Sequence, residues 1–346
     1  MTVQETAALP RSAAEDRSRD FWYPVATSEE LQDSPIGVRL LGERVVLFRS
    51  AGTPVALHDL CVHRGTPLSM GRVEGDFIVC AYHGWTYGAD GKCQRIPQRP
   101  SSAIPAKAKV PCYQVIERYG LLWVCMGTPA LPLPPFPEFD DPSFGTVFVG
   151  TQEWNAGAAR IMENFLDVAH FAWVHTGLLG DPRRPEVFVS PLERTEQGFS
   201  YTARTQIEPT PGEWRDEPLD YRITLPYWFS VVHSEGHTPT GGAHGPATEP
   251  AQGQRYRVDI VIQPLASRES RLYTWISRNY DLDISLDGAV QFQLTVAAQD
   301  RPIVENQRPE ELPLDLAEEM HVRDVDAPAV EFRRLLRRVG LVESAD

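Results

Sequence analysis

Residues 80–87 read CAYHGWTY, and an earlier stretch, CVHRG, begins at Cys61. Each stretch sets a cysteine and a histidine within three residues of each other, at the end of a strand-like run and before a glycine. Cys61-x-His63 and Cys80-x-x-His83 therefore supply two soft sulfur ligands and two imidazoles. Either pair alone fits ordinary packing, because cysteine is often simply buried. Both pairs together indicate a metal centre.

Three kinds of site use these residue types. Tetrahedral zinc is disfavoured, because its paired ligands usually stand two to four residues apart and Cys61-x-His63 is tighter. A nucleophilic Cys80 with His83 as its base lacks a nearby third group to orient the histidine. An iron–sulfur cluster with mixed cysteine and histidine ligands accepts both spacings.

Composition excludes several classes of protein. The chain has 346 residues, enough for two domains, and a formal net charge of −14, which argues against nucleic acid as a partner. No apolar run approaches the ~20 residues of a membrane-spanning helix, and the charged N-terminus does not read as a secretory signal. Five cysteines, an odd number, fit a reducing cytoplasm. We therefore expect a cytoplasmic protein with no membrane segment.

The pattern of predicted secondary structure changes near residue 135. Residues 1–20 are expected to form a flexible tail, and residues 21–135 alternate short β-rich runs with turns. The proline-rich stretch 130–139 reads as a linker. Residues 136–346 mix strand-like and helical segments, which predicts an α+β second domain.

A second candidate site lies in the predicted helix 160–175, which contains Asp167, His170 and His175. Two histidines near a carboxylate are typical of a 2-His-1-carboxylate site, which leaves positions on Fe(II) open. Positions five apart on a regular helix diverge by about 140°. Both imidazoles can therefore reach one metal only if the helix bends or ends around residues 171–174.

Two more helices are expected. Residues 288–307 have helical character, and Pro302 should kink or restart that helix. Residues 326–340 form a short amphipathic helix with Asp326 as its N-cap and Gly340 as its C-cap signal.

Taken together, the two candidate sites make the chain, from about residue 20 to 340, resemble the Rieske non-haem iron oxygenases. Cys61, His63, Cys80 and His83 match the [2Fe–2S] ligands, and GWTY after His83 is typical of the group. Respiratory Rieske proteins add a bracing disulfide whose positions here hold Thr66 and Tyr82, so the resemblance is to the lower-potential oxygenase type. Length and the motif ERYGLLWVCMG point to the short, α-only subunits, which include demethylases and alkaloid-tailoring enzymes.

The resemblance implies an all-β Rieske domain followed by a helix-grip (START-like) antiparallel sheet with helices. It implies that His170, His175 and Asp300 bind a mononuclear Fe(II), with Glu305 as the alternative carboxylate. Asp167 matches an aspartate that bridges to a Rieske histidine of a neighbouring subunit and carries electrons between the centres. Family members form head-to-tail rings, which implies a homotrimer.

The implied reaction is monooxygenation, as hydroxylation or demethylation of a small organic substrate with O2. Alternatives are a cis-dihydroxylating dioxygenase or an oxidative cyclase or desaturase on the same scaffold. An alternative from a different functional class is a Rieske electron carrier or a ligand-binding protein without oxygenase activity. NAD(P)H would act only indirectly, through a separate reductase.

Residues 91–110 carry five basic side chains and no acidic one: Lys92, Arg95, Arg99, Lys107 and Lys109. Solvated turn charges would explain them. We expect instead that this basic stretch docks an acidic ferredoxin or flavin reductase.

Aromatic residues that alternate on predicted strands are candidates for the substrate pocket, with ordinary core positions as the alternative for each. They are Tyr227, Phe229, His233, Tyr273 and Trp275. The glycine-rich stretch 235–254 is long enough to act as a lid.

Overall fold

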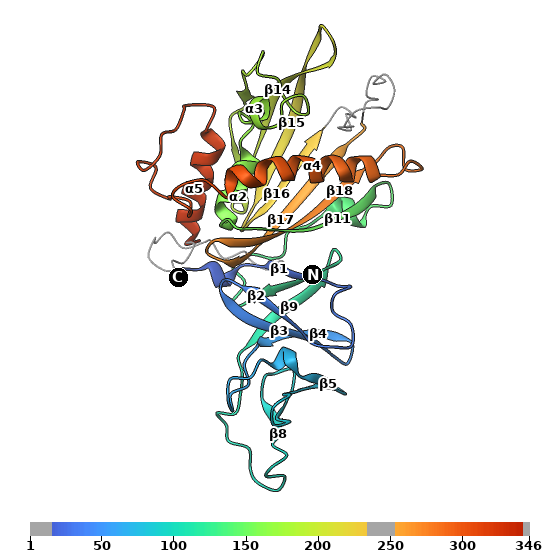
Figure 1. The fold of residues 1–346 in the computed structure, drawn as a ribbon, viewed down its shortest axis with the longest axis vertical. Coiled ribbons are helices and arrows are strands. Elements are labelled where there is room, and N and C mark those ends of the chain that lie inside the picture. Colours follow the sequence, from blue (N-terminus) through green and yellow to red (C-terminus); the bar gives the residue numbers. More distant parts are fainter. Residues whose placement is uncertain (1–15, 234–252, 342–346) are drawn as a thin grey trace, which may run out of the picture. The chain divides into compact units, whose positions relative to one another are not determined.

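The computed structural model describes residues 16–233 and 253–341, and the chain divides into two compact units. The first unit, 18–133 with 263–266, is all-β; the second contains the remaining described residues (Figure 1). Most of the predicted tail lies outside the described residues, but Ser18–Asp20 form a 3-10 helix. No helix in the described ranges is long and apolar enough to cross a membrane.

The first unit consists of two antiparallel sheets. The larger has the order β1 (Tyr23–Thr27), β10 (Leu121–Cys125), β9 (Cys112–Arg118), β4 (Thr53–His58), β3 (Glu43–Ser50) and β2 (Ile36–Leu40). The smaller has the order β5 (Arg72–Glu74), β6 (Phe77–Val79), β7 (Thr86–Tyr87) and β8 (Cys93–Arg95). A buried cluster that includes Phe48, Leu57 and Ile78 also contains Cys61 and Cys80, so both predicted sulfur ligands belong to its core.

The second unit is built on one antiparallel sheet. Its order is β11 (Gly145–Trp154), β18 (Glu269–Arg278), β17 (Tyr256–Ala266), β16 (Trp228–His233), β15 (Glu213–Thr224), β14 (Gly198–Thr210) and β12 (Phe188–Val189), and β13 (Glu193–Arg194) pairs with β14. The helices are α1 (Pro137–Asp140), α2 (Ala158–Leu166), α3 (Phe171–Val174), α4 (Asp287–Val304) and α5 (Ala327–Val339). The long helix α4 lies across one face of the sheet (Figure 1), which is the arrangement expected for a helix-grip fold.

Two buried arginines fasten α2 to its surroundings. Arg333 of α5 donates from Nε and Nη2 to the two carboxylate oxygens of Glu163 at 2.6 and 2.8 Å. Arg160 donates to Glu319 at 2.7 Å and to the Pro309 carbonyl at 2.8 Å. Both guanidinium groups are almost fully buried, so each depends on these acceptors. The network fixes the helix that leads into the predicted iron ligands.

The structure corrects two helix predictions and confirms the two predicted ends of the last helix. The helix predicted over 160–175 ends at Leu166, and α3 is a separate turn. Pro302 does not restart a helix, because α4 runs continuously through it to Val304. Asp326 is the N-cap of α5 by position, but its carboxylate makes no cap bond and instead accepts from the Val322 N–H. Gly340 does end α5 in the left-handed conformation, as predicted.

Gly91 and Gly120 of the first unit form a matched pair of turn glycines. Both have φ of +74°, but an added Cβ at Gly91 would lie 2.2 Å from the Val110 carbonyl oxygen, whereas nothing lies within 4 Å at Gly120. Gly120→Ala should therefore cost about 1 kcal/mol through the backbone alone. Gly91→Ala should cost about 2 kcal/mol more, because the backbone must move. Equal denaturation midpoints for the two variants would contradict the assigned clash.

Candidate iron centres

The two Cys–His loops of the first unit are closed by the same pair of backbone hydrogen bonds. The Cys61 N–H donates to the Thr66 carbonyl and the Gly65 N–H to the Cys61 carbonyl, at 2.8 and 2.9 Å. In the second loop the Cys80 N–H donates to the Trp85 carbonyl and the Gly84 N–H to the Cys80 carbonyl, at 2.9 and 3.0 Å. Gly65 and Gly84 both have positive φ, which explains the glycine in each motif.

The four side chains gather with sulfur inside and imidazole outside. Cys61 and Cys80 are 2 % exposed, whereas His63 and His83 are half-buried. The two imidazole centroids are 4.5 Å apart, and His63 stacks on Trp85 at 4.7 Å. Nδ1 of His63 is buried and has no hydrogen-bond partner within the described ranges. A buried, unpaired imidazole nitrogen in the same pair of loops as two buried cysteines fits the ligand set of a [2Fe–2S] cluster.

The hydroxyl of Tyr87 lies 3.1 Å from the Cys61 sulfur. Burial raises the pKa of Cys61, and the hydrogen bond from Tyr87 opposes that rise. Burial also raises the pKa of Tyr87 above its usual range, so its hydroxyl stays protonated and can donate. Tyr87 belongs to the quoted motif, but its role was not part of the prediction.

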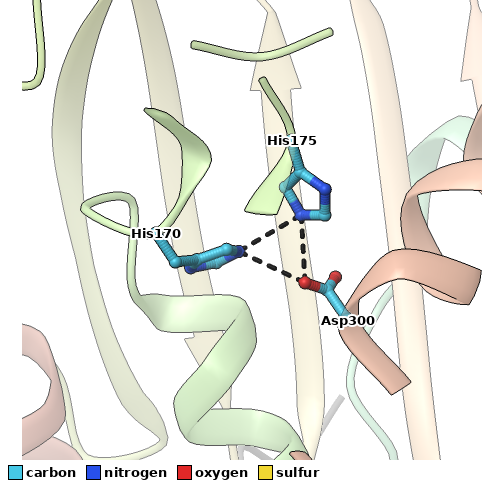
Figure 2. A group of neighbouring side chains, drawn as sticks. All are labelled: His170, His175 and Asp300. Atoms are coloured by element: carbon cyan, nitrogen blue, oxygen red, sulfur yellow. Dashed lines mark hydrogen bonds and ion pairs between the residues drawn. The ribbon is translucent and has the colours of Figure 1, made fainter. Parts of the chain in front are cut away.

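Three side chains of the second unit converge on one point (Figure 2). His170 Nε2 lies 3.3 Å from His175 Nε2, and Asp300 Oδ1 lies 3.4 Å from the first and 3.0 Å from the second. Asp300 reaches the histidines from α4, and His175 is fully buried. Glu305, the alternative carboxylate, points elsewhere: it accepts from the Asn155 N–H at 2.8 Å.

The end of α2 makes this convergence possible. Asp167 leaves the helix with an extended backbone, and its carboxylate accepts from the Ala169 and His170 N–H groups at 2.8 and 3.2 Å. Asp167 therefore stops one helix and starts the next turn, as polar residues with short side chains commonly do. His170 precedes α3 and His175 follows it with φ of −110°, outside the helix. The chain thus leaves the helix twice: at Leu166, earlier than predicted, and at Val174, within the predicted region 171–174.

Each histidine has a second partner that fixes its tautomer. His170 Nδ1 donates to Asp167 Oδ2 at 3.0 Å, and His175 Nδ1 donates to the amide oxygen of Gln299 at 2.8 Å. Both Nε2 atoms are therefore left as acceptors. Gln299 was not predicted, because nothing in the sequence near His175 refers to it.

Three acceptors now face one another in a buried place. Oδ1 of Asp300 is buried and makes no hydrogen bond within the described ranges. Burial lowers the pKa of His170, but Asp167 and Asp300 outweigh it and raise that pKa to about 9. The site thus attracts positive charge, and two imidazoles with one carboxylate are the donor set of non-haem Fe(II).

A mostly apolar cavity adjoins the three acceptors. Phe229 and His233 line it, as predicted for pocket residues, together with Tyr221, Leu272 and Thr274 among others. The structure corrects the other three pocket predictions. Tyr227, Tyr273 and Trp275 are buried but do not line the cavity.

The error on β18 has a physical cause. Leu272 and Thr274 face the cavity, so Tyr273 and Trp275 leave the sheet on the other side. Which face of β18 lies toward the cavity depends on the side of the sheet that α4 covers, and no local sequence pattern reveals that side. The predicted lid, 235–254, lies almost entirely outside the described residues.

The five basic side chains of 91–110 are exposed, and Lys92 pairs with Asp90 at 2.8 Å. This stretch touches the second Cys–His loop, because the Gln98 side chain donates to the His83 carbonyl at 2.8 Å.

Comparison with known families matches both units. Residues 21–114 match the Rieske [2Fe-2S] domain, and residues 154–341 match the vanillate O-demethylase oxygenase C-terminal domain. The methylxanthine N1-demethylase NdmA of Pseudomonas putida is 31 % identical over 93 % of this chain and 89 % of its own length. The toluene-4-sulfonate monooxygenase iron–sulfur subunit TsaM1 of Comamonas testosteroni is 38 % identical over 83 % of this chain and 87 % of its own.

Solved structures agree with the fold. The structure of Pseudomonas putida CBB5 NdmA with caffeine has a TM-score of 0.78 at 29 % identity, covering 95 % of this chain and 97 % of that one. Dicamba monooxygenase bound to dicamba has a TM-score of 0.75 at 22 % identity, covering 94 % and 98 % of the two chains, and supports the fold alone.

A [2Fe–2S] domain joined to an oxygenase domain defines an oxidoreductase that consumes O2. More particularly, the chain belongs to the Rieske non-haem iron oxygenases, in the branch of the demethylase oxygenase subunits. The prediction of family and fold is thereby confirmed. The enzyme uses a Rieske cluster and a mononuclear iron, with electrons supplied by a separate reductase.

Tyr87→Phe should lower the reduction potential of the cluster. The hydroxyl stabilises the extra negative charge of the reduced state, and one hydrogen bond of about 1 kcal/mol corresponds to on the order of 50 mV. Redox titration of the purified protein measures the shift. Tyr82→Phe is the control, because Tyr82 is 64 % exposed in the same loop. Equal shifts in both variants would refute the assigned hydrogen bond.

Proposed function

We propose that the enzyme removes a methyl group from, or hydroxylates, a small organic substrate held in the cavity beside His170, His175 and Asp300. The convergence of these three acceptors at a mostly apolar cavity is the observation that carries the proposal. The relatives that cover nearly the whole chain are named as demethylases, which supports demethylation in particular.

Residue roles follow from the two sites. Cys61, His63, Cys80 and His83 would hold the [2Fe–2S] cluster in a domain formed by residues 21–135. In a catalytic domain formed by 136–346, the three acceptors would hold Fe(II), which activates O2 when reduced. A cytoplasmic location is in keeping with five free cysteines.

The side chains around the proposed iron site orient its two histidines and exclude water. Asp167 and Gln299 hold the two imidazoles with Nε2 toward the cavity. Phe229 and Tyr221, with the aliphatic walls, keep water from the reacting centre.

Asp167 would also link two subunits. Its side chain is 35 % exposed although it holds His170 Nδ1 at 3.0 Å, so part of the carboxylate is free to meet another molecule. We assign it the electron bridge to a Rieske histidine of a neighbouring subunit in a homotrimer. A partly buried carboxylate–histidine hydrogen bond couples the two groups electrostatically, which suits that role.

Metal analysis tests the assignment. The intact chain should contain about three irons and two sulfides, and His170→Ala should lose about one iron while keeping the visible spectrum of the cluster. Loss of O2-dependent product formation should accompany the loss of iron. About two irons in the intact chain, unchanged in His170→Ala, would instead favour an electron carrier or a ligand-binding protein.

The basic stretch 91–110 would dock the electron donor, a ferredoxin or a flavin reductase. Its exposed cations lie on the segment that Gln98 ties to the His83 loop, so a docked acidic partner would lie near the cluster histidines. Exposed charges of one sign accelerate association with a partner of opposite sign.

Reversing Lys92, Arg95 and Arg99 to glutamate should slow cluster reduction at least about tenfold at low salt and flatten its salt dependence. Stopped-flow reduction by an acidic ferredoxin measures both. Arg72→Glu is the control, because β5 lies at the opposite edge of the four-stranded sheet from β8. An unchanged rate and salt dependence in the triple variant would rule out docking there.

A further inference from the structure

The cavity beside the iron ligands contains no lysine or arginine within the described ranges. Most of the lining is aliphatic or aromatic, and its uncharged hydrogen-bonding side chains include three amides and two hydroxyls: Gln152, Asn164, Gln293, Thr274 and Tyr221. The amide nitrogen of Asn164 is buried without a partner in the described part of the chain, so it can donate to a guest.

The arginines of the same strands lie on the other face of the sheet. Tyr221 and Val258 line the cavity, so the adjacent Arg222 and Arg257 project away from it. Arg257 is also neutralised there: it donates to Asp259 at 2.6 and 2.8 Å and to Glu138 at 2.9 Å. None of these cations can reach a guest beside the iron ligands.

His233 does not supply the missing positive charge. Its Nδ1 lies 3.2 Å from the Glu217 carboxylate, and the two side chains are 7 % and 11 % exposed. A protonated His233 would thus carry its own counter-ion. At the iron site, Asp300 and the Asp167 carboxylate behind His170 together match the two positive charges of Fe(II).

From this distribution of charges around the cavity we infer that the enzyme selects neutral aromatic or heteroaromatic substrates with carbonyl, amide or ring N–H groups. It rejects carboxylates and sulfonates. An anion would lose its hydration in a cavity with no free cation, whereas amide side chains can satisfy a neutral polar ring. This inference rests on the proposed function, because it takes the cavity as the substrate site. The relatives do not decide the matter, since their names include a methylxanthine and toluene-4-sulfonate.

The test compares guests of equal shape that differ in charge. Calorimetry on the iron-loaded protein, without O2 or reductase, would use para-anisamide against para-anisate, toluene-4-sulfonamide against toluene-4-sulfonate, and caffeine as a further neutral ring. In every pair that binds, the neutral member should bind at least about tenfold more tightly. An anion that binds as tightly as its neutral partner, or a panel in which no neutral compound binds, would overturn the inference.

Glu217→Gln probes the source of the selectivity. Removing this buried anion removes its repulsion of an anionic guest near His233, so the neutral-to-anion affinity ratio should fall at least about threefold. Glu213→Gln is the matched control: it makes the same change on an exposed residue of the same strand, and its ratio should stay that of the parent. An unchanged ratio in Glu217→Gln would refute the role of Glu217, while the paired affinities of the parent protein test the inference even if this variant does not fold.

Turnover separates this inference from the proposed function. With a reductase and O2 present, neutral guests that bind but yield no oxidised product would contradict the proposed oxygenase reaction and leave the selectivity intact. Faster demethylation of para-anisate than of para-anisamide would contradict the selectivity and leave the oxygenase reaction intact.

Discussion

The mutual repulsion of three acceptor atoms is the constraint around which the second unit is built. The Nε2 atoms of His170 and His175 and an oxygen of Asp300 lie within 3.4 Å of one another where little water reaches. Lone pairs at such distances are tolerable only around a cation, either a metal ion or the proton that the raised pKa of His170 retains. The early end of α2, the uninterrupted α4 and the buried arginine network all hold backbone segments where these atoms must meet. Folding thereby brings the three candidate ligand atoms together, which favours metal binding.

The candidate ligands could be proposed from the sequence because much of ligand chemistry is local in sequence. Cys61 with His63 and Cys80 with His83 each form a recognisable pair, and His170 with His175 stand beside Asp167. The pocket residues predicted on β18 were wrong because the face that lines the cavity is set by where α4 packs, in a different part of the chain. The helix over 160–175 was predicted too long because a side chain, that of Asp167, overrides the helical pattern.

The supporting contacts were out of reach of sequence reasoning. Gln299 meets His175 across 124 residues of chain, and Tyr87 meets Cys61 across 26. The separation of charge by the sheet was equally hidden, because Arg257 and Val258 are neighbours in sequence and lie on opposite faces. One strand thus lines a chamber whose described lining lacks lysine and arginine, and it anchors an ion-pair network behind that chamber.

The matched turns around the two Cys–His loops bear on the speed of electron transfer. Each loop is closed by an N–H of its cysteine and an N–H of its glycine, with nearly equal distances in the two loops. A redox centre held between two short, hydrogen-bonded turns has little freedom to rearrange when its charge changes. The reorganisation energy of the cluster should therefore be small, and with it the activation barrier for passing an electron onward. The rate of electron transfer from this centre therefore depends on the two tight turns as well as on the driving force.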